Sequence, residues 1–313
     1  MVYFTEKRIS GKKYLYAVHS VRLPNGKVSK LAKRVEERKI TASLEAHFQK
    51  KEAELRAKSA EDYFKKTSVF SGRQIRGIEE TKLAYKKIVS CLTKKQLQDL
   101  FDRFTVNFTY ESNALEGNSL TLKDVAILIS ENRVPENKDL REVYETKNSR
   151  KVVDLIMKKK FRATEKDIIK MHKILIKDMD IRPGYKKVPN FLLGRNIETT
   201  PPEKVEKEMK ELFKWHKENK QMHPLRLAAL FHGKFEKIHP FEDGNGRVGR
   251  FMINTILVNN GYAPLIIRKS QRIAYLKSLG DFDNGYSENL ERFLLDKYKT
   301  TFAKFFKIYE KYV

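Results

Sequence analysis

The N-terminal part of the chain alternates between apolar and polar residues in the way of a half-buried strand. Residues 2–9 and 12–22 show this period of two, with a glycine between them that supplies a turn. An Asn-Gly pair at residues 25–26 is a strong hairpin signal before a third short segment near 27–34. The pattern predicts a small antiparallel unit of two or three strands.

Further along, the apolar residues recur every three or four positions, which is the spacing of amphipathic helices. A polar helical stretch covers about 41–65, and the apolar periodicity sets in from about residue 71. Helices are predicted at about 140–160, 165–178, 223–238, 246–260 and 288–312. The expected fold class is mainly α: a helical bundle at 71–313, joined through a helical linker at 41–70 to a small antiparallel β unit at 1–40.

Composition fits a packed core under a charged surface. Of 313 residues, 40% are hydrophobic and 34% are charged, so we expect one main core with a small accessory unit. The only cysteine, Cys91, excludes an internal disulfide and suits a reducing compartment. The first residues lack the apolar run of a signal peptide, and prolines, glycines and asparagines interrupt the most apolar stretch, 251–267. We therefore expect a cytoplasmic protein without a membrane partner.

The formal net charge of +25 admits two interpretations. A strongly basic surface attracts nucleic acid, nucleotides or acidic proteins. A lysine-rich solvated surface without such a partner is the plainer explanation, and the dispersed lysines favour it. No helix-turn-helix pattern supports nucleic acid, which therefore stays an open partner without a motif.

The richest chemistry lies in residues 239–250, His-Pro-Phe-Glu-Asp-Gly-Asn-Gly-Arg-Val-Gly-Arg, a loop leading into a helix. Gly244, Asn245 and Gly246 allow a tight bend that presents backbone N–H groups outward. The helix that begins there adds positive potential, so the segment predicts an anion site. Arg247 and Arg250 add charge-assisted donors suited to phosphate oxygens.

Two further side chains in this segment complete a reactive set. Asp243 is a hard oxygen ligand whose ion beside phosphates is Mg²⁺. His239 can accept a proton near neutral pH. Base, metal ligand, backbone N–H groups and arginines together describe the transfer of a phosphorus centre onto a hydroxyl.

This segment resembles the signature of the Fic family, H-x-F-x-[D/E]-G-N-G-R-x-x-R. Every specified position matches: His239, Phe241, Asp243, Gly244, Asn245, Gly246, Arg247 and Arg250. Eight constrained positions in twelve make the match far more specific than a lone glycine-rich loop. The resemblance covers roughly residues 70–300, weakly outside the motifs, and does not include the N-terminal strands.

The resemblance implies a Fic-fold bundle with a β-hairpin flap and a protein adenylyltransferase activity. The enzyme would transfer AMP from ATP to a Ser, Thr or Tyr hydroxyl of a target protein or of itself. His239 would deprotonate the hydroxyl, Asp243 would hold Mg²⁺, and the three residues 244–246 would cradle the phosphates. Arg247 and Arg250 would bind the β- and γ-phosphates, and Phe241 would be a buried anchor. Self-association, common in the family, leaves a homo-oligomer open.

Gly246 bears on which phosphorus is attacked. In the related Doc toxins a lysine follows the asparagine, and ATP is used for phosphorylation. A glycine at this position leaves room for the nucleotidyl-transfer orientation, which favours AMP transfer.

A second motif precedes the first. Ser112-Asn-Ala-Leu-Glu116-Gly117 is similar to the family's inhibitory pattern, [S/T]-x-x-x-E-[G/N]. Ser112 and Glu116 lie one turn apart on a helix expected near 106–117, which Gly117 would end. The resemblance implies that Glu116 pairs bidentately with Arg250 and displaces the γ-phosphate. The plain alternative is an ordinary salt bridge or cap.

Two further assignments rest on position alone. The segment 184–200 breaks the helical pattern, and Phe191, Leu192, Leu193 and Gly194 resemble the end of the family's flap, which pairs with a target's backbone. Tyr275 lies where the family tends to place an aromatic residue against adenine.

Other functions remain open at this stage. Removal of AMP or transfer of phosphate would use the same site, and a nucleic-acid-binding regulator could carry the fold as an accessory. A metallohydrolase built on His232, His239 and Asp243 lacks the i, i+4 histidine pair. His172 and His47 are expected to be ordinary helix residues. A Walker phosphate loop is excluded because its Gly-Lys-Ser/Thr ending is absent.

Overall fold

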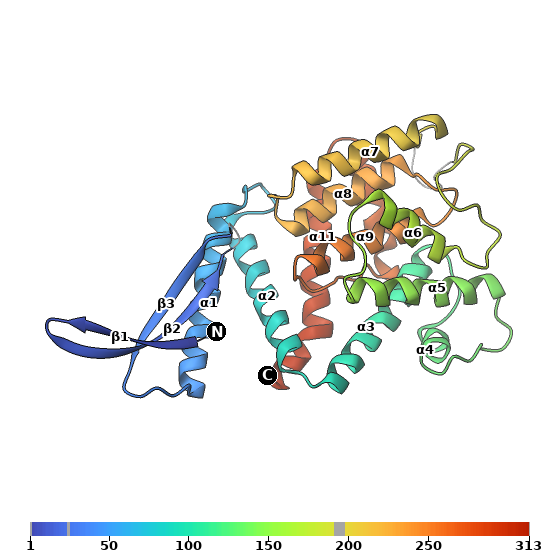
Figure 1. Cartoon of the computed structure of the whole chain (residues 1–313). Coiled ribbons are helices and arrows are strands. Elements are labelled where there is room, and N and C mark those ends of the chain that lie inside the picture. Colours follow the sequence, from blue (N-terminus) through green and yellow to red (C-terminus); the bar gives the residue numbers. More distant parts are fainter. Residues whose placement is uncertain (1, 24–25, 191–197, 313) are drawn as a thin grey trace. The chain divides into compact units, whose positions relative to one another are not determined.

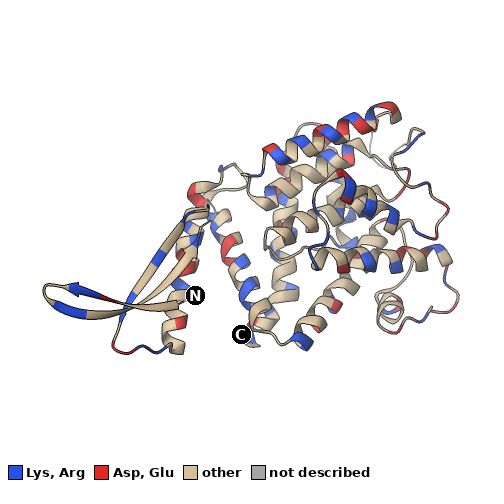
Figure 2. Cartoon of the chain, viewed as in Figure 1, with Lys and Arg blue, Asp and Glu red and all other residues tan. Residues whose placement is uncertain are grey.

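The computed structural model describes residues 2–23, 26–190 and 198–312, coloured along the chain in Figure 1. They fall into two compact units, Met1–Leu83 and Ala84–Val313. Lys and Arg are spread over the strands and most helices of both units, as Figure 2 shows. In chain order the elements are β1 (Val2–Ile9), β2 (Lys12–Arg22), β3 (Val28–Val35), α1 (Ala42–Tyr63), α2 (Gly72–Cys91), α3 (Lys94–Leu115), α4 (Leu122–Ser130), α5 (Leu140–Met157), α6 (Glu165–Leu175), α7 (Pro202–Glu218), α8 (Pro224–Ile238), α9 (Asn245–Asn259), α10 (Arg272–Asp283) and α11 (Ser287–Thr301).

The first unit is an antiparallel sheet in the order β1-β2-β3, with α1 packed on one face. Ala17 of β2 forms a small core with Leu44 and Phe48 of α1. Apolar side chains of the outer strands close this core: Val2, Phe4, Leu31 and Val35. The strands predicted from the alternating pattern are therefore confirmed, within a residue of the expected bounds.

The second unit is helical, and most of its core lies along α8 and α9, whose residues are buried over nearly their whole length. The predicted helices are present, with ends that differ by a few residues, except that the helix expected near 106–117 begins much earlier, as α3 at Lys94. The expected helix over 288–312 needs a correction, because α11 ends at Thr301 and the chain continues as a π turn and a 3₁₀ turn. The π turn keeps Phe302 and Phe306 buried, with ring centroids 6.2 Å apart.

Two helices carry side chains to the start of α9. Helix α3 begins at a capping box made by Thr93 and Gln96, and it contacts α9 through Phe108 and Phe251, whose ring centroids are 5.4 Å apart. Helix α5 packs against both α3 and α9. The C-terminal end of α3 and the N-terminal end of α5 therefore lie next to the loop at 239–244. Among the helices of the described residues, none combines the length and apolar character needed to cross a bilayer.

Candidate active site

The loop between α8 and α9 begins with an abrupt turn at His239. Its backbone is left-handed, with φ 50° and ψ 61°, and its N–H donates to Phe235 O at 2.9 Å as the cap of α8. Pro240 then has no N–H with which to continue the helix. A left-handed backbone is uncommon outside glycine, so the surrounding contacts must hold His239 in this position.

Phe241 supplies much of that restraint. Its side chain is fully buried and stacks on His172 of α6, with ring centroids 3.8 Å apart. Asn245 fixes the Phe241 backbone twice, because its Oδ1 accepts from Phe241 N at 2.9 Å and its Nδ2 donates to Phe241 O at 2.8 Å. The expectation that Phe241 is a buried anchor is confirmed.

His172 contacts the loop on its other side. Gly184 N, in the segment after α6, donates to His172 Nδ1 at 3.4 Å, and His172 Nε2 lies 3.1 Å from the carbonyl oxygen of Asp243 in the loop. Since Nδ1 accepts, Nε2 carries the proton and donates. Burial lowers the pKa of His172 to about 4, which keeps this neutral tautomer in place. His172 is thus the helix residue expected from the sequence, and it also orders the loop.

The start of α9 has the backbone of an anion site. Gly244 caps the helix with φ 81°, a conformation that side chains disfavour, and as a glycine it offers no side-chain acceptor to the first turn of N–H groups, although its own N–H donates to Asp243 Oδ1. Arg247 lies buried in that turn, and its Nε has no hydrogen-bond acceptor among the described residues. Unpaired donors of this kind suit a bound anion.

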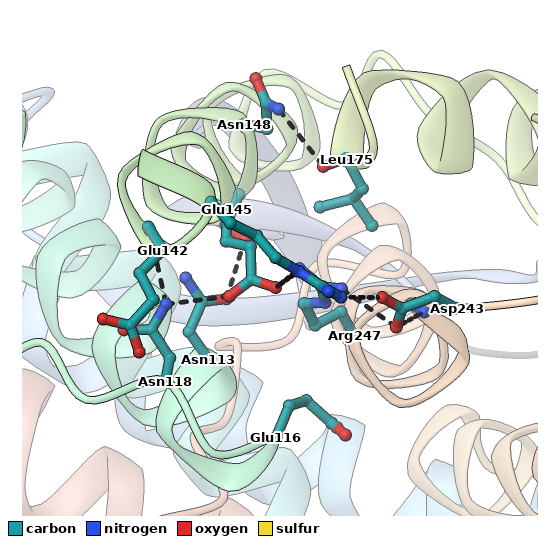
Figure 3. A network of polar contacts seen from close by, with 12 residues as sticks. Asn113, Glu116, Asn118, Glu142, Glu145, Asn148, Leu175, Asp243 and Arg247 are labelled. Atoms are coloured by element: carbon teal, nitrogen blue, oxygen red, sulfur yellow. Dashed lines mark hydrogen bonds and ion pairs between the residues drawn. The ribbon is translucent and has the colours of Figure 1, made fainter. Parts of the chain in front are cut away.

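Asp243 and Arg247 belong to a network with α5, drawn in Figure 3. Arg141 Nη2 lies 2.7 Å from Asp243 Oδ2, and Arg247 Nη2 lies 3.4 Å from Asp243 Oδ1. Glu145 Oε1 is 3.3 Å from Arg247 Nη1. Asp243 therefore has oppositely charged neighbours on both α5 and α9, and Arg247 has one on α5 as well.

The network continues into the turn after α3. Asn118 Nδ2 donates to Glu145 Oε2 at 2.9 Å and to the Glu142 carbonyl oxygen at 3.4 Å. A hollow of ≈ 510 Å³ opens here, lined by Glu116, Arg141 and Glu145 among others. The turn that carries Glu116 is thus connected through Glu145 to Arg247.

Glu116 reaches the other arginine. Its Oε1 lies 2.7 Å from Arg250 Nη2, while Arg250 also donates from Nε to Ser112 Oγ at 3.0 Å and from Nη2 to Ser112 O at 2.8 Å. Arg250 is only 3% exposed, so burial disfavours its charge, but the Glu116 carboxylate together with Tyr275 and Glu236 offsets this and raises the pKa of Arg250. A Cβ atom at Gly246 would collide with Glu116 Oε1, so the glycine also makes room for the glutamate.

A second set of groups lies behind His239. Its Nδ1 is 3.8 Å from Oε2 of Glu236, a buried carboxylate one turn earlier on α8. His232 Nδ1 lies 4.0 Å from Glu236 Oε1, and His232 Nε2 lies 2.7 Å from the hydroxyl of Tyr275. Burial and the Glu236 carboxylate raise the pKa of Tyr275. His232 therefore does not face Asp243 as a metal ligand would, but belongs to a buried series that ends at His239.

Most of the residues predicted from the sequence thus lie in two clusters around the start of α9, while His239 faces Glu236 and Asn245 fixes the backbone of Phe241. One contains Asp243, Gly244 and Arg247, and the other contains Ser112, Glu116, Gly246 and Arg250. Tyr275 is 3% exposed and stacks on His232, and its adenine contact stays a prediction. The flap residues at 191–194 lie outside the described residues.

Three charged residues of the site were not predicted: Arg141, Glu145 and Glu236. Arg141 and Glu145 are four residues apart on one face of α5, a spacing visible in the sequence. Nothing local shows that this face meets a loop 102 residues away in the chain. Glu236 falls three residues before His239, but only the left-handed turn brings the two side chains together.

Comparisons with known proteins agree with this geometry. Residues 162–257 match the model of the Fic/DOC family. The proteins named protein adenylyltransferase Fic from Drosophila melanogaster and Nematostella vectensis are each 31% identical, over 193 and 192 residues. These matches cover 60% and 59% of this chain but 39% and 45% of the relatives, so the chain spans less than half of their length.

Solved structures give the same result for the fold. A Fic-domain-containing signaling protein from Bacteroides thetaiotaomicron has a TM-score of 0.66 and 26% identity, covering 74% of this chain and 96% of that one. Fic-1 from C. elegans, residues 134–508, has a TM-score of 0.64 at 21% identity, covering 84% and 77%. The bundle and its loop define a protein of the Fic fold. Within that fold, residues 162–257 are the part of the chain that matches the Fic/DOC family model.

Proposed function

We propose that this protein transfers AMP from ATP to a hydroxyl of a target protein or of itself, and that Glu116 restrains the reaction. The observation that carries the proposal is the arrangement at the start of α9. There the His239 imidazole, the backbone N–H groups of the first turn of α9 and two buried arginines lie on one loop and the helix that follows it, which suits a polyphosphate. The names of the curated relatives support the same activity.

The reaction needs a base beside the attacked phosphorus. His239 takes the proton of the attacking hydroxyl, whose oxygen forms a bond to the α-phosphorus of ATP. The bond from that phosphorus to the bridging oxygen breaks, and pyrophosphate leaves with the electron pair. The N–H groups at 244–246 and Arg247 hold the phosphate oxygens, since donors fixed in place stabilise the charge that develops there.

Asp243 suits a magnesium ion whose other ligands come mainly from the phosphates of the nucleotide substrate and from water. The described residues contain no group of three or more His, Cys, Asp or Glu side chains that could bind a metal by themselves. Mg²⁺ in nucleotide sites is held by one or two carboxylates together with phosphates and water, and Asp243 supplies one carboxylate. When bound, the ion would neutralise phosphate charge. Arg141, which pairs with this carboxylate, would have to give way.

The restraint follows from competition for Arg250. In the proposed reaction the Arg250 guanidinium, which here pairs with Glu116, binds the terminal phosphate of ATP. The Glu116 carboxylate also occupies the space that a Cβ atom at Gly246 would need. A nucleotide at this position would find Arg250 already paired, and its phosphates would lie near the negative charge of Glu116. We therefore expect low activity in the wild type.

Labelled ATP tests the proposal directly. Wild type, Glu116→Gly and His239→Ala are incubated with Mg²⁺ and ATP carrying label in the α- or the γ-phosphate, and protein-bound label is counted. We expect weak self-labelling from α-label in wild type, an increase of about tenfold or more in Glu116→Gly, and none in His239→Ala. Glu131→Gly is the matched control, because Glu131 caps α4 as Glu116 caps α3, without facing Arg250.

Each contrary result has a definite meaning. Transfer of γ-label would replace AMP transfer with phosphate transfer. Loss of AMP from pre-labelled protein in wild type, but not in Glu116→Gly, would assign the removal of AMP to Glu116. Equal labelling in wild type and Glu116→Gly would refute the restraint.

A further inference from the structure

The sheet of the first unit has one face that α1 does not cover. Alternation along the strands places Phe4, Ala17 and Leu31 on the face toward α1, and His19 on that face contacts Glu52 of α1. The side chains between them point to the opposite side, which we call the outer face. It consists of Tyr3, Thr5, Lys7, Ile9, Lys12, Tyr14, Tyr16, Val18, Ser20, Arg22, Val28, Lys30, Ala32 and Arg34.

Charge on the outer face has one sign. All of its charged residues are cations, and each is exposed: Lys7, Lys12, Arg22, Lys30 and Arg34. No aspartate or glutamate lies among its strand positions, whereas the face toward α1 includes Glu6. The strands that carry these cations can be followed in Figure 2. Basic residues are dispersed over the whole chain, but on the outer face they occur without acidic residues at the neighbouring strand positions.

Tyrosines hold two of these cations against the sheet. The Arg34 guanidinium lies over the Tyr14 ring, 4.0 Å from its centroid, and Lys7 Nζ lies 5.3 Å from the centroid of Tyr16. Such contacts limit the freedom of long side chains and keep their charged ends at the surface. Because the cations occupy these rings, the rings are not open platforms on which unpaired bases would stack.

Spacing indicates which polyanion fits. Outer-face residues two apart on a strand are about 7 Å apart, and neighbouring strands are about 5 Å apart, so three strands span roughly 10 Å. The major groove of DNA is about 12 Å wide, and its edges carry rows of phosphates. We propose that the outer face binds double-stranded DNA through its phosphates, with Lys7, Lys12, Arg22, Lys30 and Arg34 as the contacting residues.

The test measures the anisotropy of a labelled duplex of about 20 base pairs, titrated with the full chain over a range of salt. The variant Lys7→Gln/Lys12→Gln/Lys30→Gln removes three outer-face charges. The control Lys50→Gln/Lys51→Gln/Lys58→Gln removes three exposed charges from α1, on the other side of the sheet, and leaves the same net charge.

We expect the outer-face variant to bind about tenfold or more weakly near 0.1 M salt. The slope of log K against log salt should become shallower by roughly 2 to 3, since each lost phosphate contact accounts for about 0.9. The control should stay within about twofold of wild type, and a single strand of equal length should bind more weakly than the duplex. Circular dichroism of both variants checks that they are folded.

Equal weakening by the two variants would show a diffuse charge effect and overturn the proposal. So would the absence of duplex binding, or binding of anionic lipid vesicles in preference to the duplex. The AMP-transfer assay on the Glu116→Gly background should be unchanged by the outer-face substitutions. The DNA proposal and the proposed function can therefore fail separately.

Discussion

Arg141 Nη2 and Asp243 Oδ2 are 2.7 Å apart, although 102 residues separate them in the chain. The carboxylate that would hold Mg²⁺ is therefore already neutralised by a cation from α5. The Asp243 side chain is 37% exposed and that of Arg141 is 61% exposed. Water therefore screens this ion pair, and the two side chains can separate at a small cost in free energy. If Asp243 holds Mg²⁺ as proposed, this contact couples nucleotide binding to the position of the Arg141 side chain.

The substitution Arg141→Gln should strengthen Mg²⁺-dependent ATP binding. An exposed ion pair is worth about 1 kcal/mol or less, so the dissociation constant should fall by about two- to fivefold. Calorimetry on the Glu116→Gly background measures this, with Lys151→Gln, another exposed cation of α5, as control. Weaker binding would instead mean that Arg141 contacts the nucleotide.

Gly246→Ala should destabilise the protein through Glu116. The new Cβ would meet Glu116 Oε1 and would lie 2.9 Å from Arg250 Nη1, so the ion pair over the buried arginine must shift. We expect a loss of several degrees in Tm and a coupling of about 1 kcal/mol or more with Glu116→Gly in a double-mutant cycle. Gly280→Ala, on a helix with open space around the Cβ, is the control. Simple additivity of the two substitutions would contradict the predicted contact.

Glu236→Gln should slow AMP transfer without changing ATP binding. Its carboxylate lies 3.8 Å from His239 Nδ1 and faces the positive charge that forms when the imidazole takes a proton. On the Glu116→Gly background, kcat should fall by about tenfold or more while KM for ATP changes less than about twofold. Glu242→Gln, in the neighbouring loop, is the control. A change in KM alone would limit Glu236 to a structural role.

The stability of the second unit should depend on pH through Lys186. This side chain is buried, with Nζ donating to Asn190 Oδ1 at 2.7 Å and to Thr199 Oγ1 at 2.8 Å. Burial lowers its pKa from 10.5 to about 8. Between these two values the unfolded chain binds more protons at this lysine, so its contribution to the free energy of unfolding rises with pH. Below the folded-state pKa of about 8, Lys186 is charged in the folded and the unfolded chain, so the free-energy cost of burying its charge is fully present.

Denaturant unfolding of wild type and Lys186→Met at about pH 7.5 and about pH 9.5 measures this effect. The stability of wild type relative to the variant should rise between the two conditions. Lys187→Met, an exposed neighbour, should show no such change. Parallel pH profiles of wild type and Lys186→Met would count against a buried charge at this position.

The sequence by itself determined the features whose causes are local. Strand alternation placed β1 and β2, and the Asn-Gly hairpin signal placed β3 within a residue, because a period of two leaves one register that packs Phe4, Ala17 and Leu31 on one face. The signature at 239–250 identified the loop and its candidate reactive side chains, because glycine, proline and the start of a helix act on adjacent residues. The motif at 112–117 likewise placed a glutamate at the end of a helix.

The tertiary structure alone decided what these residues face. The pairings of Arg141 with Asp243 and of Glu145 with Arg247 depend on how α5 packs against the start of α9. The approach of Glu236 to His239 depends on a left-handed backbone that stacking and hydrogen bonds at Phe241 maintain. A helical sequence fixes which residues share a face, but only packing in the folded chain fixes which loop that face meets.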